Sequence, residues 1–166
     1  MAAKQICLRS FLPEDQEQIL DILTDDTVNK TYMLPAFTDR TDAVPLFERL
    51  IHLSNDKNRY VRCISTDGKA IGFINDVVSK NGKIELGYVI HPSEQRKGYM
   101  TAALKTAISE LFAAKYETVI CGAFEENAAS IRVMEKSGMK RTPETEIIEY
   151  RNEAHTCVYY AITKEN

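Results

Sequence analysis

The junction around Gly98 carries residue types that bind anions. The stretch 88–108 reads YVIHPSEQRKGYMTAALKTAI, in which an apolar run gives way to a short polar turn and then to a helical pattern. The first N–H groups of a helix have no partner within the helix, and the helix dipole adds positive potential at that end. We therefore expect the backbone N–H groups of residues 96–101 to bind phosphate, with Gly98 leaving room for it. The side chains of Arg96 and Lys97 add positive charge. The alternative for the same residues is a plain solvated turn.

Two common nucleotide-binding motifs are missing from the sequence. It contains neither the G-x-x-x-x-G-K-[ST] pattern of P-loop proteins nor the G-x-G-x-x-G pattern of dinucleotide-binding folds. The sequence therefore gives no support to a nucleoside triphosphatase or to a dinucleotide-dependent oxidoreductase.

Composition limits the class of protein further. The 166 residues are 44% hydrophobic and 27% charged, which suits one domain spanning 1–166 with a buried core. The formal net charge of -3 provides no basic surplus for binding nucleic acid. No apolar run approaches the ~20 residues of a membrane helix, and the start of the sequence lacks the apolar core of a signal peptide. We predict a cytoplasmic protein that binds neither nucleic acid nor membrane.

The cysteines and histidines do not have the spacing of a metal site. No C-x-x-C pair occurs, and the three histidines share no ligand spacing. Each cysteine lies in a stretch that is predicted to be a strand, so we expect four buried, reduced thiols and no metal. The cysteines are Cys7, Cys63, Cys121 and Cys157.

The elements that position these residues alternate between strands and helices. Apolar periodicity and the Asp-Gly and Asn-Gly turn signals predict strands at 4–10, 59–65, 69–79, 83–91, 117–124, 139–151 and 153–163. Helices are predicted from Pro13 to about Leu23, from an N-cap at Thr41, after Gly98, and from an N-cap at Asn127 to Ser137. Residues 24–40 are predicted to be irregular.

This order of elements predicts an α/β fold. The strand–helix–strand sequence from 83 to 124 implies a parallel pairing, whereas the hairpins imply antiparallel ones. We therefore expect a mixed, largely antiparallel central sheet of about seven strands with helices on both faces.

Two motifs resemble the GNAT acetyltransferase superfamily. In QRKGYM, which follows ELGYVIHP, Gln95 and Gly98 match the first motif. In NAASIRVMEKSGM the matching positions are Asn127, Ser130, Lys136 and Gly138. The order of elements agrees along nearly the whole chain, and the sequence is most similar to the branch that includes ribosomal-protein alanine N-acetyltransferases.

The sequence departs from the superfamily pattern at two methionines. Met100 stands where glycine or alanine is usual, and we expect its backbone N–H to face phosphate while its side chain joins the apolar helix face. Met134 stands where many members carry the tyrosine that protonates the leaving thiolate, so the commonest general acid is missing.

The resemblance implies transfer of an acetyl group from acetyl-CoA to an amine by direct attack in a ternary complex. The pyrophosphate would lie on the backbone of 96–101, and the pantetheine arm would pair with the strand at 83–91. The cofactor-binding residues implied in this way are Tyr88, Val89, Ile90, Arg96, Lys97, Gly98, Tyr99, Met100, Thr101 and Asn127.

An alkyl amine with a pKa near ~10 must lose a proton before it attacks a thioester. Glu85 is the candidate base, because strand alternation places it on the same face as Gly87, which leaves space for substrate. The alternative is an exposed strand carboxylate. The backbone N–H of Val89 is the candidate for stabilising the oxyanion.

Ser130 matches the serine proposed as general acid in the ribosomal branch. Its alternative role is that of a first-turn residue that helps to cap a helix. Tyr99, Tyr159 and Tyr160 are the other candidates for protonating the thiolate.

The acceptor is left open by the sequence. We expect it to be bound by residues 24–40, the start of the second helix and the loop at 149–154, whose acidic side chains would attract an ammonium group. A protein N-terminus, a polyamine and an aminoglycoside all remain possible acceptors, and an acyl-CoA-binding module without catalysis is the rival function. The chain is expected to be a monomer or a homodimer.

Overall fold

Seven strands form one mixed sheet in the computed structural model, which describes residues 5–165. The strands are β1 (Cys7–Arg9), β2 (Val61–Thr66), β3 (Lys69–Lys80), β4 (Lys83–Ile90), β5 (Thr118–Phe124), β6 (Lys140–Tyr150) and β7 (Glu153–Thr163). Their order in the sheet is β1-β2-β3-β4-β5-β7-β6. β4 and β5 pair in parallel, whereas β1 with β2, β2 with β3, β5 with β7 and β6 with β7 are antiparallel. The predicted mixed, largely antiparallel sheet is confirmed.

The helices follow the predicted order with small changes at their ends. The α-helices are α1 (Gln16–Leu23), α2 (Val28–Thr31), α3 (Val44–Ser54), α4 (Tyr99–Ala114) and α5 (Ala128–Lys136). Three 3-10 turns precede α1, α3 and α4, namely η1 (Pro13–Asp15), η2 (Arg40–Ala43) and η3 (Pro92–Glu94). Among residues 5–165, no helix has both the length and the apolar character needed to cross a bilayer.

Three sequence expectations need correction. Thr41 is not the N-cap of the second helix, because the Asp39 side chain accepts hydrogen bonds from the Thr41 and Asp42 N–H groups and so caps η2. The segment 24–40 was expected to be irregular but contains α2. Cys7 is exposed, whereas the other three cysteines are buried as predicted. Of the predicted first strand, Lys4 lies outside the described residues.

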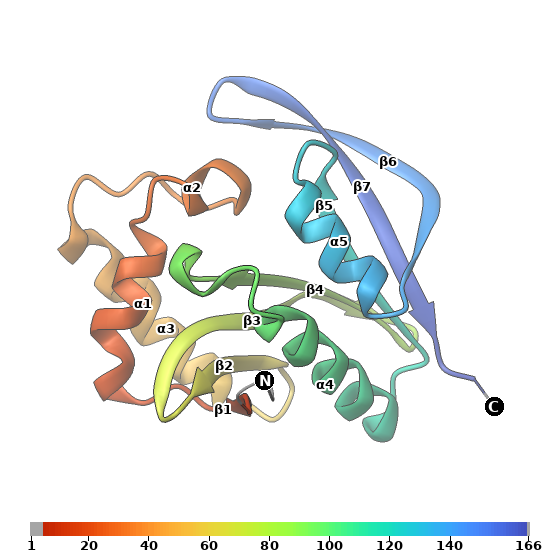
Figure 1. The fold of residues 1–166 in the computed structure, drawn as a ribbon, viewed down its shortest axis with the longest axis horizontal. Helices are drawn as coiled ribbons and strands as arrows, with labels where there is room; N and C mark the ends of the chain where they lie inside the picture. The colour runs from red at the N-terminus through yellow and green to blue at the C-terminus, as the bar shows by residue number, and fades with distance from the viewer. Residues whose placement is uncertain (1–4, 166) are drawn as a thin grey trace. The chain divides into compact units, whose positions relative to one another are not determined.

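One compact unit contains residues 5–75 and 88–103. Its helices α1 and α3 pack side by side, and α3 contacts β2 (Figure 1). The apolar faces of these elements meet in an aromatic cluster, where Phe11 lies 6.3 Å from Phe47 and 5.9 Å from Phe73 between ring centroids. Burial of such side chains stabilises the unit by about 1.5–3 kcal/mol for each one.

The second unit contains residues 76–87 and 104–165. Within it, Lys83–Leu86 of β4 pair with Thr118–Cys121 of β5, and β7 lies between β5 and β6. The long β6–β7 hairpin is the blue ribbon of Figure 1.

The predicted apolar face of α4 is confirmed, since all six of its residues are buried. They are Met100, Ala103, Leu104, Ala107, Ile108 and Leu111.

Candidate active site

The loop that leads into α4 has the backbone geometry expected of an anion site. Arg96 and Gly98 both have positive φ, 65° and 83°, so the chain turns sharply before the helix. The helical ladder begins with the Ala102 N–H donating to the Gly98 carbonyl at 3.1 Å, which leaves the N–H groups of Tyr99 and Met100 at the helix entrance. A Cβ atom on Gly98 would meet no atom within 4 Å, so the space beside this backbone is open.

The charge at this loop differs from the sequence expectation in one respect. The Lys97 ammonium lies 3.1 Å from the Glu94 carboxylate, so part of its charge is already balanced. The Arg96 side chain is exposed. Arg96 and the helix N-terminus therefore supply most of the positive potential that an anion would meet here.

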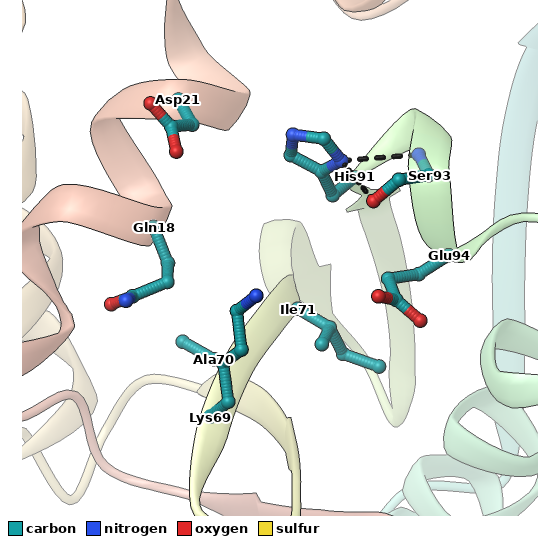
Figure 2. Close-up of a pocket in the computed structure, with 8 residues that line it drawn as sticks. All are labelled: Gln18, Asp21, Lys69, Ala70, Ile71, His91, Ser93 and Glu94. Atoms are coloured by element: carbon teal, nitrogen blue, oxygen red, sulfur yellow. Dashed lines mark hydrogen bonds between the residues drawn. The ribbon is translucent and has the colours of Figure 1, made fainter.

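His91 holds the turn that precedes the loop. Its Nδ1 accepts a hydrogen bond from the Ser93 N–H at 3.1 Å and lies 2.8 Å from the Ser93 hydroxyl, so it caps η3 (Figure 2). Its own backbone N–H donates to the Ile71 carbonyl at 2.8 Å. This role was not predicted, because histidine is not among the residue types that are usually expected at an N-cap.

A small hollow lies beside His91 in the same unit. Figure 2 shows residues that line it from three elements, among them Asp21 of α1, Lys69 of β3 and Glu94 of η3. Its volume of about 50 Å³ is far below the 300–1,000 Å³ of a typical ligand pocket. This hollow is therefore too small to hold a coenzyme.

The predicted pantetheine-binding residues form the end of β4 in the first unit. Val89 and Ile90 are each 8% exposed, and Tyr88 is half-buried. Met100 is 5% exposed, which agrees with the expectation that its side chain joins the apolar face of α4.

Glu85 lies on β4 in the second unit, at the edge of a hollow of about 310 Å³. Burial raises the pKa of Glu85 above its usual range, and the negative charge of Glu146 raises this pKa further. A carboxylate with a raised pKa is a better proton acceptor, so this environment suits a general base. The hollow is lined by Val78, Lys80, Asn81, Lys83, Glu85 and Ile120.

Asn127 and Ser130 meet at the start of α5. The Asn127 side chain accepts a hydrogen bond from the Ser130 N–H at 3.2 Å, so the predicted N-cap is confirmed. Ser130 is half-buried. Its backbone therefore takes part in capping, and its hydroxyl remains the candidate acid.

Two acidic residues of 24–42, Asp25 and Asp42, have structural roles. Asp25 accepts hydrogen bonds from the Thr27 and Val28 N–H groups, and Asp42 accepts them from the Thr38 and Asp39 N–H groups. These carboxylates therefore stabilise turns and helix starts. Among residues 5–165, no group of three or more histidine, cysteine, aspartate or glutamate side chains is placed to hold a metal ion.

Comparison with known proteins gives a family and a set of similar folds. A family model described as an acetyltransferase (GNAT) domain matches residues 5–140. No curated protein matches the sequence. Among solved structures, a GNAT-family acetyltransferase from Bacillus anthracis is 25% identical, with a TM-score of 0.82 over 98% of this chain and 97% of that one.

Two further similar structures share the fold at lower identity. A ribosomal L7/L12 alpha-N-protein acetyltransferase, RimL, in complex with coenzyme A has a TM-score of 0.84 at 14% identity, over 98% of this chain and 95% of that one. A spermidine N-acetyltransferase from Vibrio cholerae in complex with CoA and spermine has a TM-score of 0.78 at 16% identity, over 96% of this chain and 95% of that one.

Proposed function

Because the chain belongs to the GNAT acetyltransferase domain family, we propose that it is an N-acetyltransferase that moves an acetyl group from acetyl-CoA to a primary amine. The observation that carries this proposal is the loop before α4, where positive φ at Arg96 and Gly98 opens a helix N-terminus toward an anion. The pyrophosphate of acetyl-CoA is the anion that this loop would bind.

The chemistry follows from the groups that the chain supplies. Glu85 takes a proton from the acceptor ammonium, and the freed nitrogen lone pair attacks the thioester carbonyl. The Val89 N–H stabilises the oxyanion of the tetrahedral intermediate. The C–S bond then breaks, and the thiolate takes a proton from Ser130 or from solvent. The raised pKa of Glu85 supports its role as the base.

Acetyl-CoA binding tests the proposal directly. We expect titration calorimetry to show binding of acetyl-CoA, and we expect Gly98→Ala to weaken it by at least about tenfold, because a methyl group would occupy space that the phosphates need. Gly68→Ala is the matched control. Gly68 also has positive φ, 77°, and open surroundings, but it lies in the β2–β3 turn.

Both glycine variants should lose about 1 kcal/mol of stability because alanine is strained at positive φ. Only Gly98→Ala should lose affinity for acetyl-CoA. A wild-type chain that does not bind acetyl-CoA, or equal affinity in the two variants, would contradict the proposed phosphate site.

Release of free CoA thiol separates catalysis from mere binding. A panel of acceptors should include spermine, an aminoglycoside and peptides with different N-terminal residues, since similar folds act on amines of more than one kind. The proposal expects acetyl-CoA turnover that depends on one class of amine. Tight binding of acetyl-CoA without turnover on any amine would favour the acyl-CoA-binding module instead.

A further inference from the structure

Glu85 and Tyr159 lie on the same face of the sheet in the second unit. Glu85 is directly opposite Ile120 on β5, and Ile120 is opposite Ala161 on β7. Side chains two residues apart on a strand point to the same side, so Tyr159 shares the face of Ala161 and hence of Glu85.

Glu146 joins this face from β6. It is directly opposite Cys157, which lies two residues before Tyr159 on β7. The Tyr159 hydroxyl donates a hydrogen bond to the Glu146 carboxylate at 2.8 Å. Along β7, Tyr159 therefore lies two residues before Ala161, which is in register with Glu85, and two residues after Cys157, which is in register with Glu146. β5 lies between the strands of Glu85 and Tyr159, whereas β6 and β7 are direct neighbours.

Gly122 holds the Tyr159 ring in this position. A Cβ atom at Gly122 would come within 2.8 Å of Tyr159 Cε1 and 3.2 Å of Cys157 Sγ. The ring can lie against the backbone of β5 only because residue 122 has no side chain. This packing fixes the direction of the hydroxyl, and the hydroxyl in turn orients the Glu146 carboxylate.

We propose that Glu146 and Tyr159 are positioning residues for Glu85: the Tyr159 ring packs against Gly122, and its hydroxyl holds the Glu146 carboxylate on the sheet face that carries Glu85. This inference rests on the proposed acetyl transfer. In that reaction the proton leaves the acceptor nitrogen for a Glu85 oxygen, the nitrogen lone pair forms the new N–C bond, and the C–S bond breaks.

Other titratable groups also surround Glu85. Lys80 and Lys83 line the same hollow and bring positive charge. From β6, Lys140 lies opposite Ala161 and so shares the face of Glu85, and Glu144 interacts electrostatically with Lys83. The buried thiols of Cys121 and Cys157 interact electrostatically with Glu85. Burial and the charge of Glu146 nevertheless raise the pKa of Glu85. Among these charged groups, Glu146 is therefore the one whose removal should change the pKa of Glu85 most.

The dependence of kcat/KM on pH tests this arrangement. Glu85 must be ionised to act as a base, so activity rises with pH through its titration. Glu146→Gln removes a negative charge, and we expect the rising limb to move to lower pH. The plateau should fall by about two- to tenfold, because a weaker base accepts the proton less readily.

Tyr159→Phe keeps the ring against Gly122 but removes the hydroxyl. We expect the rising limb of kcat/KM against pH to move to lower pH in this variant, by less than it does in Glu146→Gln. In the Glu146→Gln background, Tyr159→Phe should add no further shift, since the hydroxyl acts through Glu146. Glu135→Gln is the control, because it removes the same charge from an exposed position on α5 and should leave the profile unchanged.

Titration of Glu85 can also be followed without any acceptor. The protein is labelled with ¹³C at glutamate Cδ, and the Glu85 signal is assigned as the one that is missing from Glu85→Gln. In protein labelled in this way, Glu146→Gln should move the titration of Glu85 to lower pH. An unchanged titration and an unchanged pH profile would overturn the inference. A shifted titration in a protein that releases no thiol would instead overturn the proposed function and leave the coupling intact.

Discussion

Glu85 is a half-buried carboxylate on which the proposed chemistry depends. Glu85→Gln keeps the size and polarity of the side chain but removes its ability to accept a proton. We expect turnover to fall by about 10²- to 10⁴-fold, as is usual when a general base is lost. Binding of acetyl-CoA, measured by calorimetry, should change little, because the carboxylate acts on the acceptor amine. Turnover equal to that of wild type would remove Glu85 from the mechanism.

The sequence was sufficient to single out Glu85 but not its partners. Alternation along β4 separates Glu85 from the buried Ile84 and Leu86, and this pattern is local. The hydrogen bond between Tyr159 and Glu146 depends on how β7 packs against β5 and β6. The tight turn between β6 and β7 sets the register that pairs Glu146 with Cys157. No tight turn links β7 to β5, so the register that places Tyr159 and Glu146 on the face of Glu85 is set by packing and cannot be counted from the chain.

The turn before α1 depends on a buried ion pair. Asp15 is 3% exposed and accepts two hydrogen bonds from the Arg9 guanidinium, at 2.7 and 2.9 Å, and one from the Leu12 N–H. Burial alone would raise the pKa of Asp15, but the hydrogen bonds from Arg9 and Leu12 outweigh it and lower this pKa. The pair joins β1 to the start of α1.

Asp15→Asn should therefore destabilise the protein. We expect a loss of about 3 kcal/mol in the free energy of unfolding, because the Arg9 charge loses its partner in a partly buried place. Urea denaturation at pH 7 measures this loss. Asp21→Asn breaks an exposed pair with Arg40 and should cost less than about 1 kcal/mol.

The same carboxylate gives a pH signature. The lowered pKa means that the stabilisation by Asp15 is present above the unfolded value of about 4 and is lost as pH falls through the folded value. The difference in stability between wild type and Asp15→Asn should therefore shrink in acid. A difference that stays constant down to about pH 2 would contradict this account.

Helix positions were predictable where the signal is a repeated apolar face, as in α4. The residue at which each helix begins was harder to predict. Thr41 and Asp39 are both good N-caps by type, and only the backbone hydrogen bonds of η2 decide between them. The short helix α2 escaped prediction because four residues are too few to show a period.

Binding of acetyl-CoA should stabilise the chain against unfolding. A ligand at about 100 times its Kd that binds only the folded state adds about 2.7 kcal/mol. For a chain of this length, that corresponds to a rise of roughly 5–10 °C in Tm. Differential scanning fluorimetry with and without acetyl-CoA measures the rise, and Gly98→Ala should reduce it. A Tm that does not respond to acetyl-CoA would contradict the binding site.

The contrast between Cys7 and the three interior thiols determines how the protein will behave toward a disulfide reagent. Cys63, Cys121 and Cys157 are buried, and burial raises the pKa of each, to about 12 for Cys63, so neither access nor ionisation favours their reaction. In a colorimetric thiol assay of released coenzyme, the exposed Cys7 of the native chain should react rapidly and add one equivalent of thiol per molecule to the signal. Three more equivalents should develop as molecules denature, so the reagent that follows turnover also reports how much of the preparation remains intact.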